Sequence, residues 1–262
     1  MPYFLFFDID GTLVDEKLDI VPESTVYALQ KAKENGHKIF ICTGRCKAIW
    51  PQNVLNIGFD GVIGGCGTHI YYHGEELLHA TLERELQMEI AEDMMKYHID
   101  GVLEGPEESY FRKDLWIPVV KNIYKSNGTF SAKSNLFLED VKGLNFDKMA
   151  LWHDETSDMA SFKAKYESRF DFIERDPTFY EIVPKGYSKA TGIEFLCKYL
   201  NQSREYTIGV GDSTNDLSML DYVQISIAMG SGNPEIFPYV DYVTAPVMED
   251  GIEKALKKYQ LI

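Results

Sequence analysis

The sequence predicts an α/β protein in which a doubly wound, mostly parallel sheet is interrupted by an inserted α+β segment. Apolar runs alternate with amphipathic runs at both ends of the chain, whereas the middle has shorter and less regular elements. Strands that alternate with helices require parallel pairing through right-handed crossovers, so the two end segments form one domain. We therefore expect a core domain of residues 1–81 and 186–262, and an inserted domain of residues 82–185.

The first expected strand is the apolar run Tyr3–Phe7, whose β-favouring residues suit burial on both faces of a sheet. An amphipathic segment from Glu23 to Glu34 follows, with Pro22 before it and Gly36 after it, as is typical of a helix. The apolar run Lys38–Cys42 then supplies a second strand. These elements form a βαβ unit.

The next elements continue this alternation. A helix is expected near Ala48–Leu55 and a strand at Gly61–Ile63. Ile70–Tyr72 and Glu76–Leu78 flank the dipeptide His73-Gly74, which predicts a hairpin.

The inserted segment is expected to combine helices with short strands. Its helices are expected near 85–98, 116–124 and 157–169, and its strands near 101–103, 109–112, 148–152, 172–174 and 179–183. The core pattern then resumes with a helix at 189–200, a strand at 206–210, a short helix from Asp216, and strands near 226–229 and 242–243.

The composition is that of a globular protein and restricts its partners. Hydrophobic residues make up 45% of the 262 residues and charged residues 26%, which argues against disorder. The net charge of -15 opposes nonspecific binding to nucleic acid or to an anionic membrane. No apolar stretch approaches the roughly 18 residues of a membrane span. A small phosphorylated metabolite remains compatible, because local cations can capture an anion.

The cysteines and the N-terminus indicate a cytoplasmic protein. The cysteines form no Cys-x-x-Cys pair, and the six histidines do not cluster at zinc-ligand spacing. No basic leader precedes the first apolar run, so we expect no secretion signal. We therefore expect reduced thiols at Cys42, Cys46, Cys66 and Cys197 and a cytoplasmic location.

The chemistry is expected to begin where the first strand ends, at Asp8-Ile9-Asp10-Gly11-Thr12. Strand geometry sends side chains i and i+2 to the same side, so Asp8 and Asp10 would point together. Two carboxylates side by side after an apolar strand repel each other unless a cation, a proton or a substrate compensates them. The alternative interpretation is a strand followed by an ordinary polar turn.

Two further strand ends carry polar motifs, Thr43-Gly44-Arg45 and Gly211-Asp212-Ser213-Thr214-Asn215-Asp216. Open α/β sheets place their ligands at the carboxyl ends of the strands, so these motifs should meet the first one in a single crevice. Asp8, Asp10 and Asp212 would then concentrate negative charge, with Asp216 as a further candidate. Mg²⁺ suits such a site best, because it takes oxygen ligands.

The same crevice offers hydrogen-bond donors for a phosphate group. Thr43, the backbone after Gly44, and Asn215 can donate to phosphate oxygens. Lys189, at the start of an expected helix, adds a cation and a favourable helix dipole. Arg45 is expected either to meet the distal part of a bound substrate or to form a structural ion pair.

These motifs resemble those of the haloacid dehalogenase superfamily, and in particular the Cof-type phosphatases with an inserted α+β cap. The matching motifs are Asp8-Ile9-Asp10-Gly11-Thr12, Thr43-Gly44-Arg45, Lys189 after Gly186-Tyr187-Ser188, and Gly211-Asp212-Ser213-Thr214-Asn215-Asp216. Similarity continues through Ala228-Met229-Gly230 and Asp241-Tyr242-Val243-Thr244, so it spans the whole core. The resemblance implies a Rossmann-like core and a C2-type cap.

The resemblance also implies roles for individual residues. Asp8 would attack phosphorus as the nucleophile and form an aspartyl-phosphate. Asp10 would protonate the leaving alkoxide and then accept a proton from the hydrolytic water, which requires a pKa above that of Asp8. Mg²⁺ would be bound by the Asp8 carboxylate, the Asp10 main-chain carbonyl and Asp212. The phosphoryl oxygens would be held by the Ile9 amide, Thr43, Gly44, Lys189 and Asn215.

The chain departs from the family pattern at a few positions. Ala190 replaces the glycine that often follows the motif lysine, and the turn Gly230–Asn233 is longer than the usual Gly-Asn-Ala. Lys185 competes in sequence with Lys189 for the phosphate role, and we favour Lys189 because it directly precedes the helix.

The activity that the resemblance implies is Mg²⁺-dependent hydrolysis of small phosphomonoesters, such as sugar phosphates. One alternative is a sugar phosphomutase, which uses the same aspartyl-phosphate but returns the phosphoryl group to a sugar. Another is a phospho-acceptor signalling module, because receiver domains also phosphorylate an aspartate at a strand end. Asp10 and the long insert argue against this last alternative.

Overall fold

The computed structural model describes residues 2–130, 135–140 and 142–262 of the chain. The chain separates into two compact units. The first unit comprises Met1–Gly44, Trp50–Leu78 and Ser188–Ile262, and the second comprises Arg45–Ile49 and His79–Tyr187. The bounds of the expected domains, 1–81 with 186–262 and 82–185, stay a prediction.

The first unit is built around a sheet that has eight strands among the residues described, in the order β14-β13-β12-β1-β2-β3-β4-β5. The strands are β1 (Phe4–Phe7), β2 (Lys38–Cys42), β3 (Gly61–Gly64), β4 (His69–Tyr72), β5 (Glu75–His79), β12 (Thr207–Gly211), β13 (Ile225–Ala228) and β14 (Tyr242–Val243). Pairing is parallel from β14 through β3 and antiparallel between β3 and β4. The sheet is therefore mostly parallel, as the sequence predicted.

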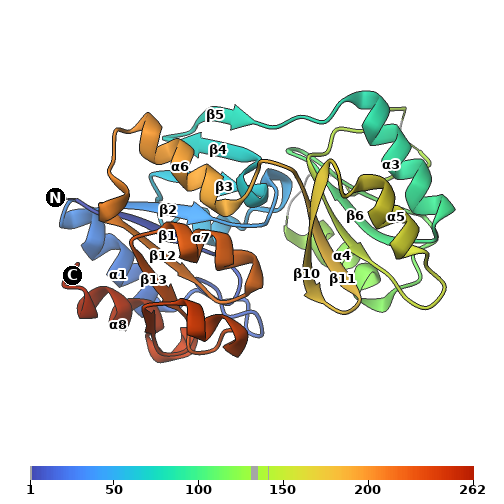
Figure 1. Cartoon of the computed structure of the whole chain (residues 1–262). Coiled ribbons are helices and arrows are strands. Elements are labelled where there is room, and N and C mark those ends of the chain that lie inside the picture. The colour runs from blue at the N-terminus through green and yellow to red at the C-terminus, as the bar shows by residue number, and fades with distance from the viewer. Residues whose placement is uncertain (1, 131–134, 141) are drawn as a thin grey trace. The chain divides into compact units, whose positions relative to one another are not determined.

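Helices cover both faces of this sheet. They are α1 (Glu23–Glu34), α2 (Gln52–Leu55), α6 (Lys189–Tyr199), α7 (Leu217–Tyr222) and α8 (Gly251–Lys258). Figure 1 shows α1 and α8 on one face of the sheet and α6 and α7 on the other, and the two hydrophobic clusters divide in the same way. None of the helices in the described part of the chain is long and apolar enough to cross a membrane.

Strand β1 is buried on both faces, which explains its uninterrupted apolar sequence. Leu5 and Phe7 pack into the cluster that contains α1 and α8, while Phe4 and Phe6 pack into the cluster that contains α6 and α7. All four residues are at most 2% exposed. This alternation fixes the direction in which the residues that follow the strand can point.

Most of the elements expected in the first unit are present. The helix 23–34 and the strand 38–42 have the predicted bounds. The hairpin between β4 and β5 turns at His73 and Gly74, whose φ values of 47° and 85° suit a two-residue turn.

The expected helix at Ala48–Leu55 is wrong, because the chain forms two separate short elements there. A 3₁₀ turn covers Lys47–Ile49, and α2 begins only at Gln52. Pro51 lies between them in an extended conformation, with φ of -73° and ψ of 125°. Proline lacks a backbone N–H and disfavours helical geometry in the residue before it, so one continuous helix cannot form across this position.

The second unit contains a mixed sheet in the order β10-β11-β9-β6-β7-β8, flanked by its own helices. The strands are β6 (Asp100–Glu104), β7 (Ser109–Phe111), β8 (Asn135–Phe137), β9 (Lys148–Trp152), β10 (Phe170–Asp176) and β11 (Phe179–Pro184), and the helices are α3 (Arg84–Lys96), α4 (Pro118–Phe130) and α5 (Met159–Tyr166). Strand β8 was not expected, and it pairs in parallel with β7.

Each face of the second sheet has its own hydrophobic cluster. Leu103, Met149 and Leu151 pack into the cluster that includes residues of α3 and α5. Val102 and Ala150, on the opposite face, pack into a cluster that includes Val120 of α4. The second unit therefore has an α+β core of its own.

We expect Phe40→Ala to destabilise the first unit by about 3–5 kcal/mol, because it opens a cavity in a close-packed core. The Phe40 side chain is fully buried, and its ring centroid lies 5.1 Å from those of Phe4 and Phe6. Denaturant unfolding followed by circular dichroism measures the loss. Tyr239→Ala, at a side chain 68% exposed, is the control and should change stability by less than about 0.5 kcal/mol. Equal losses in the two variants would contradict the assignment of Phe40 to the core.

Candidate active site

Three strand ends that carry the polar motifs lie side by side in the first sheet. Phe7, the last residue of β1, is in register with Ile41 of β2 and with Val210 of β12. The Asp8 amide donates to the Val210 carbonyl at 3.0 Å, which extends the β1–β12 pairing by one residue. The motifs that begin at Asp8, Thr43 and Asp212 therefore follow three adjacent parallel strands, as the sequence predicted.

Strand alternation and one helix start bring Asp8 and Lys189 together. Asp8 continues the Phe4 and Phe6 side of β1, which faces α6, and Lys189 is the first residue of α6. The helix start is fixed by a capping box, in which the Ser188 side chain accepts from the Thr191 amide and the Thr191 hydroxyl accepts from the Ser188 amide.

Close packing of α6 on β3 keeps Lys189 within reach of the strand ends. A Cβ atom added to Gly192 would lie 2.5 Å from the Ile63 side chain, so glycine permits this approach.

The Lys189 side chain is fully buried and bridges two carboxylates. Its Nζ donates to Asp8 Oδ1 at 2.6 Å and to Asp216 Oδ1 at 2.5 Å. Burial by itself lowers a lysine pKa, but the charges of Asp216 and Asp8 outweigh it and raise the pKa of Lys189 well above its usual value. Lys189 is therefore a permanent cation at the centre of the site.

Asp216 holds the loop after β12 in place. Its Oδ2 accepts hydrogen bonds from the Asp212 amide at 2.9 Å and the Ser213 amide at 3.1 Å, while its other oxygen contacts Lys189. A Cβ atom on Gly211 would lie 2.5 Å from the Asp216 carboxyl carbon, so only glycine leaves room for this side chain. Asp216 thus links the β12 loop to α6.

Asp8, Asp212 and Asp216 form a compact acidic cluster. Each offers a carboxylate oxygen, and these oxygens all lie within 4.8 Å of one another. Burial raises the pKa of Asp8 to about 7, and the charges of Asp216 and Asp10 add to this rise while Lys189 opposes it. Burial also raises the pKa of Asp212 to about 9, together with the charges of Asp216 and Asp8. One lysine lies among these three carboxylates and contacts Asp8 and Asp216, so the cluster carries uncompensated negative charge when it is ionised.

The donor set of this cluster fits a hard divalent cation. All of its donor atoms are carboxylate oxygens, which Mg²⁺ and Ca²⁺ prefer, and neither thiol nor imidazole belongs to the group. A bound dication would compensate the charge that raises the two aspartate pKa values. The arrangement of Asp8, Asp212 and Asp216 therefore makes this cluster a candidate metal site.

The remaining predicted residues lie in the same loops. Asp10 is half-buried and close enough to Asp8 for its charge to raise the Asp8 pKa. Ile9 is buried, and its carbonyl accepts from the Leu13 and Val14 amides at 2.9 Å, which turns the chain sharply after β1.

The donors expected for phosphate are also at the strand ends. Thr43 is 1% exposed, and its amide donates to the Ile63 carbonyl at 2.8 Å. Gly44 follows it and is half-buried. Asn215 lies in the loop after β12, where its Oδ1 accepts from the Ser213 hydroxyl at 2.9 Å.

Two basic residues that were open alternatives lie in the second unit. Lys185 is exposed and pairs with Asp171 at 2.9 Å, whereas Lys189 contacts Asp8 directly. Arg45 donates to the Ile49 carbonyl at 3.2 Å, and its charge also acts on buried Glu104. Between the two lysines, Lys189 is the one that contacts the acidic cluster.

Sequence reasoning did not anticipate three of the contacts. Asp216 was named only as a possible metal ligand, although it is also the second partner of Lys189. Cys42 lies with its Sγ 3.9 Å from the Lys189 carbonyl oxygen, and burial raises the pKa of its thiol. Exposed Glu16 adds negative charge near Asp212. The motif that contains Asp216 indicated that this residue belongs to the site but not that it pairs with Lys189, and neither Cys42 nor Glu16 belongs to a motif.

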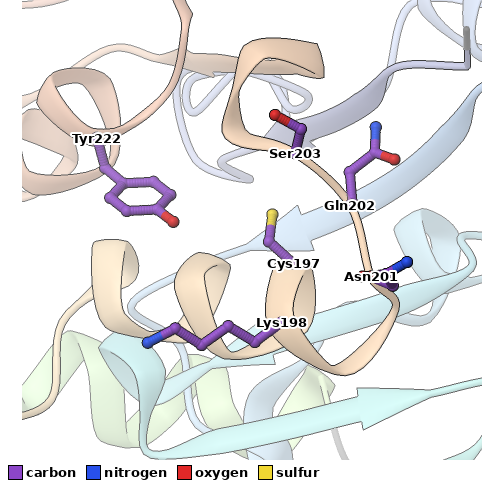
Figure 2. A pocket seen from close by; sticks show the side chains of 6 residues that line it. All are labelled: Cys197, Lys198, Asn201, Gln202, Ser203 and Tyr222. Atoms are coloured by element: carbon purple, nitrogen blue, oxygen red, sulfur yellow. The ribbon is translucent and has the colours of Figure 1, made fainter.

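A surface pocket at the far end of α6 contains none of the predicted site residues. Figure 2 shows its lining, which consists of Cys197, Lys198, Asn201, Gln202, Ser203 and Tyr222. Cys197 is eight residues along α6 from Lys189, roughly 12 Å along a helix axis. Burial raises the pKa of the Cys197 thiol to about 11, so it is protonated and unreactive at neutral pH.

The first unit is thus an α/β domain whose mostly parallel sheet carries a buried lysine among strand-end carboxylates, and the α+β unit is inserted into its chain. The family model for haloacid dehalogenase-like hydrolases matches residues 5–256. This chain belongs to that family.

Curated relatives match almost the whole chain. The putative phosphatase YkrA of Bacillus subtilis strain 168 is 29% identical, with 98% of each chain covered. The 5-amino-6-(5-phospho-D-ribitylamino)uracil phosphatase YitU of the same organism is 26% identical, over 98% of this chain and 97% of that protein. Both relatives bear names of phosphatases.

Solved structures agree with the sequence relatives. The sugar phosphatase BT4131, described as a member of subclass IIB of the superfamily, is 29% identical, with a TM-score of 0.84 over 99% of this chain and 100% of that one. A protein from Geobacillus kaustophilus HTA426 is 27% identical, with a TM-score of 0.85 over all of both chains. The predicted α/β class with an inserted second sheet is confirmed.

The family and these relatives establish the coarse activity. The chain is a Cof-type phosphatase of the haloacid dehalogenase superfamily, a hydrolase of phosphoric monoesters that acts on small phosphorylated metabolites. The family implies a divalent metal, and Asp8, Asp212 and Asp216 are the candidate ligands.

We expect Lys189→Met to lower the free energy of unfolding by about 3–5 kcal/mol, because removal of one partner leaves buried charges uncompensated. Asp8 and Asp216 would lose their shared cation. Denaturant unfolding in metal-free buffer measures the effect.

Lys185→Met is the matched control, because the Lys185 and Asp171 side chains are 50% and 52% exposed. Its effect should stay within about 1 kcal/mol, as is usual for a surface ion pair. A Lys189→Met variant as stable as this control would show that the buried bridge does not support the fold.

Proposed function

We propose that this protein is a Mg²⁺-dependent phosphatase that hydrolyses small phosphomonoesters, sugar phosphates among them, through an aspartyl-phosphate on Asp8. One observation carries the proposal above all. Asp8, the first residue after β1, contacts buried Lys189 at 2.6 Å and belongs to a cluster of three carboxylates within 4.8 Å. Such a site combines a nucleophile, a fixed cation and a place for a metal.

In the first step, an Asp8 carboxylate oxygen attacks phosphorus and the bond from phosphorus to the leaving oxygen breaks. The products are the aspartyl-phosphate and an alcohol, once the leaving oxygen has gained a proton. Lys189 supports this step, because its contact with Asp8 favours the ionised carboxylate that acts as the nucleophile.

Asp10 is proposed as the general acid and base. It gives its proton to the leaving oxygen in the first step and takes a proton from water in the second, when water attacks the aspartyl-phosphate. This second step releases inorganic phosphate and restores the Asp8 carboxylate. The position of Asp10, two residues after Asp8 and close enough to affect its pKa, supports the assignment.

The metal would be held by the Asp8 carboxylate, the Asp10 main-chain carbonyl and Asp212, with Asp216 as a further carboxylate of the cluster. Mg²⁺ is proposed because it prefers oxygen ligands and commonly binds through carboxylates together with substrate phosphate. When bound, it would screen the negative charges of the nucleophile and the phosphate from each other.

The phosphoryl oxygens are proposed to be held by donors from the same strand ends. Those donors are the Ile9 amide, Thr43, Gly44, Lys189 and Asn215. Amides, hydroxyls and a lysine at a helix N-terminus are suitable groups for binding a phosphate. In this arrangement Lys189 would serve both Asp8 and the substrate.

The proposed substrate class follows from the names of relatives and from charge. One curated relative is named as a phosphatase of a ribitylaminouracil phosphate, another as a pyridoxal phosphate phosphatase, and one solved neighbour as a sugar phosphatase. A net charge of -15 disfavours phosphate-bearing polymers as substrates. Sugar phosphates and similar metabolites are therefore the class to test first.

Asp8→Asn is expected to lower the release of inorganic phosphate from a panel of metabolite monoesters by at least about 10³-fold, because the amide cannot act as the nucleophile. Release is measured colorimetrically with Mg²⁺ present. Asp171→Asn, at an exposed residue that pairs with Lys185, is the control and should retain full activity. Asp8→Asn turnover at the control rate would refute the covalent mechanism.

The same panel distinguishes hydrolysis from phosphoryl transfer between sugar positions. A phosphatase converts a hexose 1-phosphate to free hexose and inorganic phosphate. Isomerised hexose phosphate without inorganic phosphate would instead identify a mutase, and phosphorus NMR separates these products. We expect inorganic phosphate.

Removal of divalent metal is expected to abolish turnover reversibly, because carboxylates alone would repel the phosphate dianion. The enzyme is treated with EDTA, desalted and assayed before and after addition of Mg²⁺. Mg²⁺ should restore activity, whereas Na⁺ at equal ionic strength should not. Full activity in the metal-free enzyme would contradict the proposal.

A further inference from the structure

Hydrogen bonds hold the main chain of Asp212 on both sides of its Cα. Its amide donates to Asp216 Oδ2 at 2.9 Å, and its carbonyl accepts from the Asn233 amide at 2.7 Å. The second bond comes from the Gly230–Asn233 turn, where this chain departs from the usual family pattern. The unusual turn is therefore in direct contact with a candidate metal ligand.

Gly232 in this turn packs directly on the Asp212 backbone. A Cβ atom added there would lie 2.4 Å from the Asp212 carbonyl oxygen and 2.9 Å from its Cα. The Gly232 amide also donates to the Met229 carbonyl at 2.9 Å, which closes the turn against the end of β13. Backbone atoms cannot yield as a flexible side chain can, so a larger residue at 232 would displace Asp212.

The Asp212 carboxylate is bounded by the chain that follows β1. The Thr12 hydroxyl donates to Asp212 Oδ1 at 3.4 Å, and Thr12 is fully buried. Gly11 has a φ of +73°, and a Cβ atom there would lie 2.5 Å from Asp212 Oδ2. Gly11 and Thr12, which follow Asp8 in the chain, thus also shape the surroundings of Asp212, the residue after β12.

The contacts of Asp212 oppose an electrostatic repulsion on its carboxylate. Asp216 and Asp8 both repel the Asp212 carboxylate, and Lys189 gives its hydrogen bonds to those two residues and not to Asp212. Asp212 is half-buried, so rotation of its side chain away from the cluster would relieve the repulsion. The bond from the Thr12 hydroxyl favours the position within the cluster, and Gly11 leaves room for the carboxylate there.

We propose that Thr12 and Gly232 are positioning residues for the metal. Thr12 orients the Asp212 carboxylate, and Gly232 allows the 230–233 turn to fix the Asp212 main chain. The inference rests on the proposed function only in taking Asp212 as a metal ligand. The contacts that support these roles are with Asp212.

The test is calorimetric titration of Mg²⁺ into metal-free protein without substrate. Loss of a group that orients a metal ligand typically weakens metal affinity about 10- to 100-fold, and we expect this loss for Thr12→Val. Thr12→Ser keeps the hydroxyl and should restore affinity to within about threefold of the wild type. Thr12→Ala is the second variant that lacks the hydroxyl, should Thr12→Val fail to fold.

The role of Gly232 is tested against a second glycine that serves as the control. Gly232→Ala should weaken Mg²⁺ binding in the same range, about 10- to 100-fold. Gly143→Ala, at an exposed glycine where an added Cβ would have no neighbour closer than 3.5 Å, should bind Mg²⁺ like the wild type. Circular dichroism confirms which variants are folded.

The outcomes separate this inference from the proposed function. In the variants that bind weakly, the Mg²⁺ concentration for half-maximal activity should rise while the KM for substrate stays near the wild-type value. The positioning roles are overturned if Gly232→Ala and a folded Thr12 variant, either Thr12→Val or Thr12→Ala, bind Mg²⁺ with wild-type affinity. The proposed phosphatase activity would still stand in that case. A wild-type protein that binds no Mg²⁺ overturns the metal site itself.

Discussion

The buried contact of Lys189 with Asp8 and Asp216 is the interaction on which the site depends. The two carboxylates follow different strands and are 208 positions apart in the numbering, yet one ammonium group neutralises part of the charge of both. Like charges in a buried loop cluster would otherwise drive these loops apart. The lysine cannot leave the site, because α6 begins at this residue and packs closely against β3.

The same charge balance explains why the site is built to accept a further cation. One lysine lies among three carboxylates and contacts two of them, and burial raises the pKa values of Asp8 and Asp212. A bound metal ion would favour the ionised forms of both aspartates. Both carboxylates would therefore be fully ionised only when the ion is bound. Lys189 would thus hold the loops together, and the metal would compensate the remaining negative charge of the carboxylates.

The second unit repeats this arrangement within its own core. Buried Lys148 of β9 contacts Glu181 at 2.5 Å and Glu104 at 3.2 Å, and Arg175 also contacts Glu181 at 3.1 Å. These residues come from neighbouring strands of one sheet, so their charges are compensated locally. In both units a buried lysine contacts two carboxylates from different segments of the chain, and these contacts link those segments.

The sequence by itself determined the order of the core elements and the identity of the loops that carry the chemistry. The apolar run Tyr3–Phe7 indicated a buried strand, which the structure has at Phe4–Phe7, and the βα alternation placed the acidic motifs after parallel strands. The break of the expected helix at Pro51 was also readable from the sequence, because proline is a local signal. Only the tertiary structure decided that Asp216 pairs with Lys189 and that Thr12 and Gly232 adjoin Asp212. Periodicity reports which face of an element is buried, whereas these contacts depend on the distance between chain segments that no local pattern encodes.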